Sequence, residues 1–314
     1  MPYIGAVATH LVPWRTAWDA ALYGDDGFFR TSTPADHFRT SAHVGTFAVA
    51  VAELARRAGA RTVVDLGAGG GELLTALHGL LPGVELIGVE IAPRPAGLPD
   101  DVAWTSALPE RVTGLVIANE WLDNLPCPVV ERDDDGLDRE VLVDPSTGEE
   151  ALGDVHDSPW TTRWWPLGSA GERSEDGAPR DAAWADVVAR VDGVAVAIDY
   201  GHLAGDRPPF GTLRSYADGR EVDVRPDGSR DVTADVAVDA VAAAVGGRLV
   251  RQRDALAELG VNGARPPVEL AHSDPSAYVR ALSRAGEAAE LTARGGLGDF
   301  WWIVTDTRHG TLTA

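Results

Sequence analysis

The chain has 314 residues, enough to bury a large core, and its 45% hydrophobic content with interspersed charge is typical of a globular protein. Its formal net charge is −21, and all 27 basic residues are arginine, so nucleic acid and anionic membrane surfaces are not expected as partners. No apolar run approaches the ~18 residues of a membrane span and no signal-peptide pattern opens the chain, so we expect a cytoplasmic protein.

From about residue 40 onward, the hydrophobic pattern alternates between helical and strand-like segments. A helix over residues 44–58 precedes a strand over 62–66, a glycine-rich turn, a helix over 73–81 and a strand over 84–89. This order of elements predicts a βαβ unit and a parallel sheet. The pattern then predicts further strands at 102–104, 115–118, 194–198, 248–253 and 300–305, a hairpin around Asp135-Gly136, and helices at 184–191, 235–245 and 275–290. We therefore expect an α/β fold with a doubly wound, mostly parallel sheet.

Two segments interrupt this pattern. Residues 1–39 carry Trp14 and Trp18 among other aromatic residues, and we expect them to form a helical cap packed on the core. Residues 40–314 form one domain with a hairpin and insertion at about 128–181, whose second part is rich in Gly, Pro, Ser and charge. The single Cys127 has no disulfide partner, the histidines show no metal-ligand spacing, and no metal is expected.

The strongest local signal follows the first predicted strand, in VDLGAGGGE (64–72). Glycines at 67, 69 and 71 allow a tight turn and close approach to a ligand, with a helix N-terminus behind them. Glu90 ends the next strand, where an acid binds ribose hydroxyls in doubly wound folds. A dinucleotide would be repelled by the carboxylate of Glu72, whereas Asp65 and Glu72 suit a cationic ligand such as S-adenosylmethionine (SAM).

A second signal is ANEWLDNLP (118–126), which places Asn119, Glu120 and Asp123 directly after an apolar strand. Polar residues often end strands for structural reasons alone. Ligands of such folds, however, bind at the carboxyl ends of the strands, which would bring these side chains to the ligand.

These motifs, in this order, resemble the class I SAM-dependent methyltransferases, and more narrowly the family of the MidA mitochondrial complex I assembly proteins and their bacterial relatives. Some members of that family methylate protein arginine. The resemblance covers about residues 17–305 and rests on a series of motifs: ALYGDDGFF (21–29), FRTSAHVGTFA (38–48), VVDLGAGGGELL (63–74), ANEWLDNLP (118–126), AIDYG (197–201), GTLRSY (211–216) and DVTADV (231–236).

The resemblance implies a set of donor-binding residues, which comprises Thr40, Ser41, Asp65, Gly67, Ala68, Gly69, Gly71, Glu90, Ile91, Ser106, Ala107 and Asn119. Thr40 and Ser41 also begin a helix and are candidates for capping it.

Glu120, Asp123 and Asp199 are the expected catalytic residues, and Tyr200 and Arg214 the expected substrate contacts. Carboxylates at this place pair with a guanidinium and accept the proton that it loses. Structural alternatives stay open: Asp123 and Asp199 are also candidates for capping turns, and Arg214 for pairing with a neighbouring acid.

The expected function is methyl transfer from SAM to an arginine side chain of a partner protein. The alternatives are a small-molecule acceptor, or a non-catalytic SAM-binding assembly factor. The chain departs from the family pattern at Ala42-His43, at the prolines between residues 93 and 99, and at Asp235. The prolines exclude a regular helix after Glu90.

Overall fold

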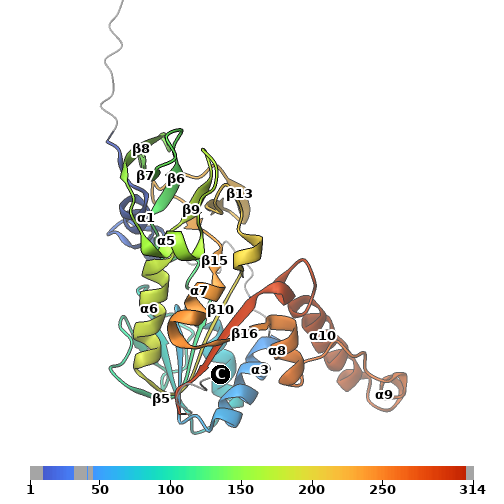
Figure 1. The fold of residues 1–314 in the computed structure, drawn as a ribbon. Coiled ribbons are helices and arrows are strands. Elements are labelled where there is room, and N and C mark those ends of the chain that lie inside the picture. The colour runs from blue at the N-terminus through green and yellow to red at the C-terminus, as the bar shows by residue number, and fades with distance from the viewer. Residues whose placement is uncertain (1–9, 32–40, 42–44, 309–314) are drawn as a thin grey trace, which may run out of the picture. The chain divides into compact units, whose positions relative to one another are not determined.

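The computed structural model describes residues 10–31, 41 and 45–308 (Figure 1). The chain divides into two compact units. The sheet unit comprises Thr33–Asp123, Asp181–Leu203 and Asp235–Ala314, and the insertion unit comprises Met1–Ser32, Asn124–Arg180 and Ala204–Ala234. Among the described helices, none is long and apolar enough to cross a bilayer.

The sheet unit is built on a seven-stranded sheet with the strand order β16-β17-β10-β5-β2-β3-β4. Its strands are β2 (Thr62–Leu66), β3 (Glu85–Val89), β4 (Ala103–Thr105), β5 (Val112–Asn119), β10 (Val191–Asp199), β16 (Arg248–Arg251) and β17 (Trp301–Asp306). All pairs from β10 to β4 are parallel, and β17 runs antiparallel to both β10 and β16. The carboxyl ends of β2, β3, β5 and β10 therefore meet at one edge of the sheet.

Apolar side chains explain why these strands are central. β5 and β10 are buried along nearly their whole lengths, which is typical of parallel strands covered on both faces. The helices of this unit are α3 (Gly45–Ala58), α4 (Glu72–Leu80), α6 (Ala178–Ala189, from Asp181 on), α7 (Val238–Val245), α8 (Gln252–Glu258), α9 (Val268–Ser273) and α10 (Pro275–Leu291). α3 buries Phe47, Ala48 and Val51 in the main core, and α4 buries Leu73, Leu74 and Leu77.

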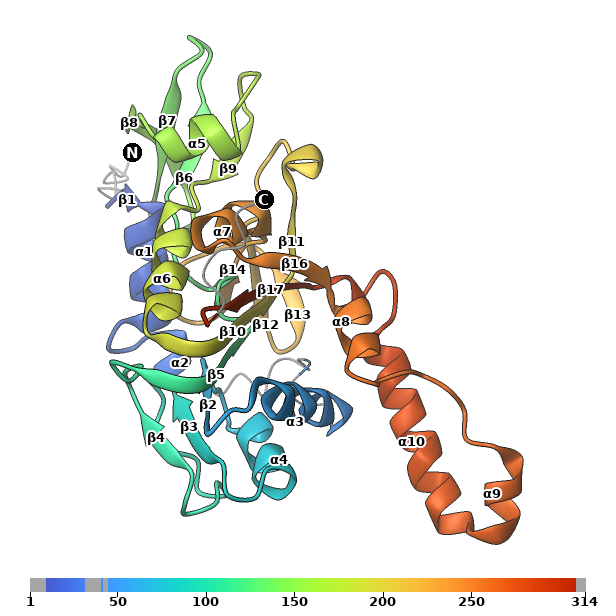
Figure 2. The same cartoon turned by 60° about the horizontal axis from the view of Figure 1, so that its bottom comes forward.

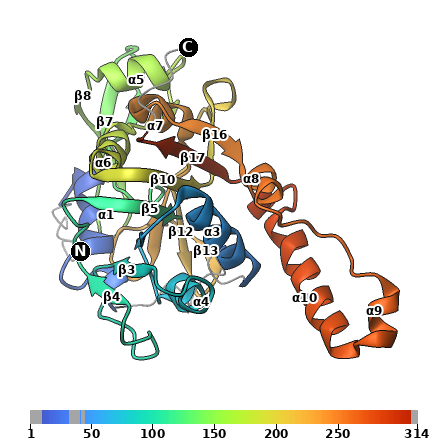
Figure 3. The same cartoon turned by 90° about the horizontal axis from the view of Figure 1, so that it is seen from below.

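The helix pair α9 and α10 extends away from the sheet in both Figure 2 and Figure 3. Only the C-terminal half of α10 is buried, through Ala285, Ala288 and Leu291. Glu287 on that half accepts hydrogen bonds from the backbone N and the Oγ1 of Thr46, at 3.0 and 2.6 Å, and so caps the start of α3.

The insertion unit contains two antiparallel sheets. The first has the order β1-β7-β6-β9 with β8 paired to β7, and the second has the order β13-β12-β14. The strands are β1 (Val12–Pro13), β6 (Val129–Arg132), β7 (Asp138–Val143), β8 (Glu150–Val155), β9 (Arg173–Glu175), β12 (Arg214–Ala217), β13 (Arg220–Val222) and β14 (Asp231–Thr233). The helices are α1 (Trp14–Tyr23), α2 (Phe28–Thr31) and α5 (Pro159–Trp164).

Trp14 and Trp18 of α1 are fully buried against Val129, Val141 and Val232 of this unit. The aromatic residues near the N-terminus are thus core residues of the insertion unit. The rest of the predicted N-terminal cap, residues 1–9 and 32–39, lies outside the described residues.

The predicted α/β sheet is confirmed, and its strands end within a few residues of the predictions. The helix predicted at 184–191 begins earlier, at Ala178, and Val191 already belongs to β10. The hairpin is confirmed too, since β6 and β7 pair and Gly136 takes φ +77° in the turn between them. The hydrophobic pattern predicted no elements in two segments that the structure shows to be ordered: residues 151–181 contain most of β8, α5, β9 and the start of α6, and residues 202–234 contain β12–β14. β8 and β9 add to the two sides of the hairpin formed by β6 and β7, and β12 pairs with both β13 and β14. The polar, glycine-rich composition of these segments gives no strand pattern.

Candidate functional site

The glycine loop after β2 is shaped by three residues in the left-handed region. Gly67 has φ +74°, Gly69 φ +53° and Gly71 φ +75°, conformations that residues with a side chain rarely adopt. The loop is fixed to the end of β3, because the backbone N–H groups of Gly67 and Ala68 donate to Val89 O at 2.9 and 3.3 Å. A Cβ at Gly67 would come within 2.9 Å of Trp121, whereas a Cβ at Gly69 would find nothing within 4 Å among the described residues. Gly69 therefore borders open space, and Gly71 is the N-cap residue of α4.

Glu90 lies at the end of β3 beside this loop. Its Oε2 accepts from Gly69 N at 3.0 Å, and its Oε1 accepts from Ile91 N at 2.6 Å and Ala92 N at 3.2 Å. The loop, Glu90 and Ile91 are thus brought together as the sequence predicted. No helix follows: residues 91–102 form turns, and the Arg94 side chain donates to the carbonyl oxygens of Leu98, Pro99 and Val102. The prediction from the prolines is confirmed.

The end of β4 lies next to Glu90, whose backbone N donates to Thr105 O at 2.9 Å. Ser106 and Ala107 follow and are exposed, and Ala107 N donates to Thr105 Oγ1 at 3.3 Å. The Thr105 hydroxyl also donates to Ala107 O at 3.3 Å, so Ser106 and Ala107 form a turn beside Glu90.

Asp65 is the buried acid of the loop, with 4% of its surface exposed. Burial of the carboxyl, together with the charges of Glu90 and Glu72, raises the pKa of Asp65 from 3.8 to about 8. At neutral pH this carboxyl is mostly protonated. A cation bound nearby would favour its ionised form and lower this pKa.

Asn119 and Glu120 follow β5 at the same edge of the sheet. Glu120 adopts φ +53°, an unusual backbone for a residue with a long side chain and one often found at functional sites. Glu120 Oε1 accepts from Asn119 Nδ2 at 3.0 Å and from Ser41 N at 3.3 Å. The side-chain oxygen Oδ1 of Asn119 is buried and has no hydrogen-bond partner in the described part of the chain.

The pKa of Glu120 is raised to about 7, by burial first and then by the charge of Asp123, against the lowering effect of the hydrogen bonds from Asn119 and Ser41. A group that titrates near neutral pH is suited to accept a proton during a reaction.

Hydrogen bonds join Asp123, which follows β5, to Asp199 and Tyr200 at the end of β10. Asp199 is 1% exposed, and its Oδ2 accepts from the backbone N–H groups of Leu122 and Asp123 at 3.0 and 3.2 Å. Its Oδ1 accepts from Tyr200 N at 3.1 Å, and Tyr200 Oη donates to Asp123 Oδ2 at 2.5 Å. The contacts of Asp199 give it a bracing role for the turn after β5, and Asp123 is oriented by Tyr200.

Ser41 joins the site to a residue that the sequence did not single out, Gln252 at the start of α8. Ser41 is fully buried, and its Oγ accepts from Gln252 Nε2 at 3.2 Å. Gln252 stands at the end of β16, a place that the strand pattern located without indicating the role of the side chain. Thr40, predicted with Ser41, lies outside the described residues, as do Ala42 and His43.

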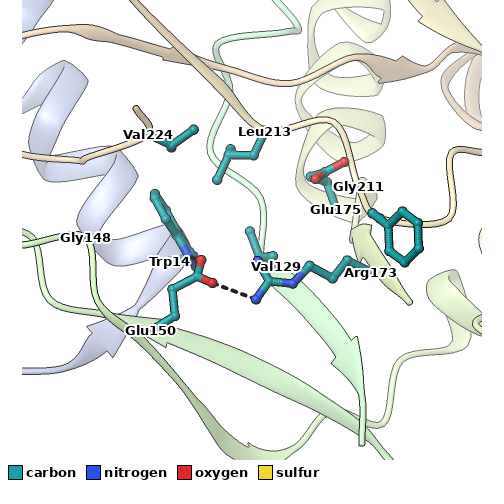
Figure 4. A pocket seen from close by; sticks show the side chains of 10 residues that line it. Trp14, Val129, Gly148, Glu150, Arg173, Glu175, Gly211, Leu213 and Val224 are labelled. Atoms are coloured by element: carbon teal, nitrogen blue, oxygen red, sulfur yellow. Dashed lines mark hydrogen bonds and ion pairs between the residues drawn. The ribbon is translucent and has the colours of Figure 1, made fainter. Parts of the chain in front are cut away.

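Arg214, the predicted substrate contact, lies on β12 of the insertion unit. That unit has a cavity of about 290 Å³, shown in Figure 4 and lined by Trp14, Val129, Gly148, Glu150, Arg173, Glu175, Phe210, Gly211, Leu213 and Val224. The polar side chains that line the cavity bond to one another: Glu150 accepts from Trp14 Nε1 and from Arg173 Nη2, each at 2.6 Å. Arg173 also pairs with Glu131, so the guanidinium already has two carboxylate partners.

Cys127 is buried in the core of the insertion unit, and burial raises the pKa of its thiol to about 11. The described residues contain no cluster of three acidic, His or Cys side chains able to hold a metal ion.

The residues of the sheet unit fit a nucleoside that carries a cation and an amino acid. The glycine loop leaves open space at Gly69, Glu90 stands beside it, and the surrounding acids Asp65, Glu72 and Glu120 favour positive charge. The unpartnered Asn119 Oδ1 requires a hydrogen-bond donor, which an ammonium group supplies.

The comparisons agree with this site. Residues 86–253 match the family model described as "Putative S-adenosyl-L-methionine-dependent methyltransferase". The match covers more than half of the chain, and the chain belongs to this family. The family resemblance and the cofactor predicted from the sequence, SAM, are thereby confirmed.

Solved structures show the same fold. A COG1565 superfamily member from Burkholderia thailandensis, bound to S-adenosyl-homocysteine, is similar with a TM-score of 0.76 and 24% identity, over 95% of this chain and 88% of that chain. A native crystal structure of a COG1565 superfamily protein from the same organism gives the same values. No curated protein matches the chain.

Proposed function

We propose that this chain is a class I SAM-dependent methyltransferase whose acceptor is the guanidinium of an arginine on a partner protein. The strand order β4-β3-β2-β5-β10-β17-β16, with β17 antiparallel, supports the class. The glycine loop, Glu90 and the exposed backbone after β4 would bind the donor. They lie at the ends of adjacent strands, where doubly wound folds bind nucleotides.

The observations that carry the proposal are the hydrogen bonds and the pKa of Glu120. Its Oε1 is occupied by Ser41 N and Asn119 Nδ2, and no described residue bonds to its Oε2. With a pKa of about 7, Glu120 is ionised in a large share of molecules at neutral pH. Its Oε2 can then pair with a guanidinium N–H and accept the proton.

When bound, SAM supplies a methyl group on a sulfonium, which is a good leaving group. The chain's own residues hold the acceptor and take its proton. A guanidinium nitrogen forms the new N–C bond as the S–C bond breaks, and the proton of that nitrogen passes to Glu120. Asp123 is held by Tyr200 and adds negative charge beside the cation, while Asp199 keeps the turn in place. The rate then comes mostly from holding the two reactants in line.

The charge of the whole protein supports a basic partner. At −21, the chain attracts cationic surfaces over the Debye length of ~8–10 Å at ordinary salt. A small cationic acceptor would be attracted in the same way, so the labelling test described next must distinguish a protein acceptor from a small-molecule acceptor.

Calorimetric titration with SAM, and separately with NADH, tests donor binding: saturable binding of SAM alone is expected. Transfer of labelled methyl to an arginine-rich peptide, compared with the same peptide carrying lysine at each arginine, tests the acceptor. Absence of SAM binding refutes the proposal. Equal labelling of both peptides, or labelling of free small amines alone, refutes the arginine assignment.

A further inference from the structure

Gln252 is a fully buried amide whose orientation is fixed by its neighbours. Trp302 Nε1, which can only donate, donates to Gln252 Oε1 at 3.1 Å. The carbonyl oxygen of Leu291, which can only accept, lies 3.4 Å from Gln252 Nε2. The backbone N of Gln252 donates to Phe300 O at 2.8 Å, which anchors the residue to the chain before β17. The amide nitrogen therefore faces Ser41.

This orientation determines the role of the Ser41 hydroxyl. Because Gln252 Nε2 donates to Ser41 Oγ at 3.2 Å, the oxygen acts as an acceptor there, and its own hydrogen must be donated elsewhere. Ser41 is fully buried, and no described residue accepts that hydrogen. A buried hydroxyl donor without an acceptor is costly unless a ligand completes it.

The neighbouring side-chain groups that remain available are hydrogen-bond acceptors. Ser41 N and Asn119 Nδ2 meet at Glu120 Oε1, so the Ser41 hydroxyl, the unpartnered Asn119 Oδ1 and the Glu120 carboxylate belong to one cluster. The Ser41 hydroxyl offers a donor for the carboxylate of an α-amino acid, and Asn119 Oδ1 offers an acceptor for its ammonium.

We propose that Gln252 is a positioning residue that sets the Ser41 hydroxyl as the hydrogen-bond donor to the carboxylate at the amino acid end of the methyl donor. The proposal rests on donor binding in the proposed function. Gln252 does not touch the donor. It fixes the direction of the Ser41 hydroxyl, and so makes the site discriminate between nucleosides with and without the carboxylate.

The test uses calorimetry on the full chain with two ligands, SAM and methylthioadenosine, which keeps the nucleoside and lacks the amino acid end. Ser41→Ala should weaken SAM binding by about tenfold to a hundredfold, the strength of a hydrogen bond to a charged group, and change methylthioadenosine binding less than threefold. Gln252→Glu should likewise weaken SAM binding and leave methylthioadenosine binding nearly unchanged. The new carboxylate would accept the Ser41 hydroxyl hydrogen and so turn it away from the ligand.

Gln252→Leu provides a second variant without a buried charge, and thermal unfolding shows whether each variant is folded. The double variant Ser41→Ala/Gln252→Leu should bind SAM about as Ser41→Ala does, since both changes remove one interaction. Equal loss for both ligands in Ser41→Ala, or no loss for either, overturns the inference and leaves the proposed function standing. A wild-type protein that binds neither ligand overturns the proposed function itself.

Discussion

The acid beside the glycine loop should lower the stability of the ligand-free protein. Asp65 is 4% exposed, and its pKa rises from 3.8 to about 8 on folding, mainly through burial. The substitution Asp65→Asn keeps the size of the side chain and replaces the ionisable carboxyl by a neutral amide. We expect the variant to be more stable than the wild type at neutral pH and weaker in SAM binding.

The magnitude follows from the linkage between protons and folding. The folded state binds the proton of Asp65 more tightly than the unfolded state, so the contribution of this group to stability is present below pH 3.8 and is lost as the pH rises toward 8. At pH 7 the loss is about 3.2 pH units at about 1.36 kcal/mol each, or about 4 kcal/mol. The advantage of Asp65→Asn should therefore grow from pH 5 to pH 8.

Urea unfolding of both proteins between pH 5 and pH 8 measures this difference. Asp134→Asn, an exposed change in the β6–β7 turn, is the control for removing a carboxyl group at the surface. SAM titrations at pH 7 in buffers of different ionisation enthalpy add a second readout, because the bound cation should ionise Asp65 and make the wild type release more protons than Asp65→Asn, in which only Glu120 remains to respond. A stability difference that does not change with pH would refute the reasoning about Asp65.

Three further outcomes are expected. Glu120→Gln keeps an acceptor oxygen for Ser41 and Asn119, so SAM binding should stay within a few-fold while methyl transfer falls about 10²–10⁴-fold. The rate of transfer by the wild type should rise with pH through about 7. An unchanged rate in the variant would exclude Glu120 as the base. Gly69→Val should abolish SAM binding by filling the open space of the loop, whereas Gly59→Val, with φ +63° and similarly open surroundings, should keep it; equal binding losses would show that backbone strain alone is responsible. Cys127 should resist thiol reagents in the native protein and react once urea unfolds it, and rapid native labelling would contradict its burial.

The sequence predicted the sheet well because its strands are apolar and buried on both faces. The runs VVDL, ELIGV and GLVIAN lie in β2, β3 and β5 nearly as predicted. Glycine spacing also located the loop, since residues at φ above +50° favour glycine.

The strands of the insertion unit were harder to predict. β9 and β12–β14 are short and carry polar residues. β8 and β13 pair with strands that are close in sequence, β7 and β12, whereas β9 pairs with the distant β6. A single sequence gives no signal for such contacts, because neither alternation nor length separates them from loops.

The site shows the same limit. Strand ends predicted that Asn119, Glu120 and Asp199 meet at one edge, but not which of them would be bound by backbone groups. Both oxygens of Asp199 in the motif AIDYG accept backbone N–H groups, and its catalytic role stays a prediction. Gln252 could not be found at all, because its role arises from contacts with Ser41 and Trp302, which are distant in sequence.

The position of β17 within the sheet has a consequence for the order of folding. The strand order puts Trp301–Asp306 between β10 and β16, with a register that joins Asp199 to Trp301 across about a hundred residues. During synthesis, β16 has no partner in the sheet until this strand has left the ribosome. Trp302 is also the donor that fixes Gln252, so the glycine loop can form early while the Ser41 end of the site is completed only when β17 docks.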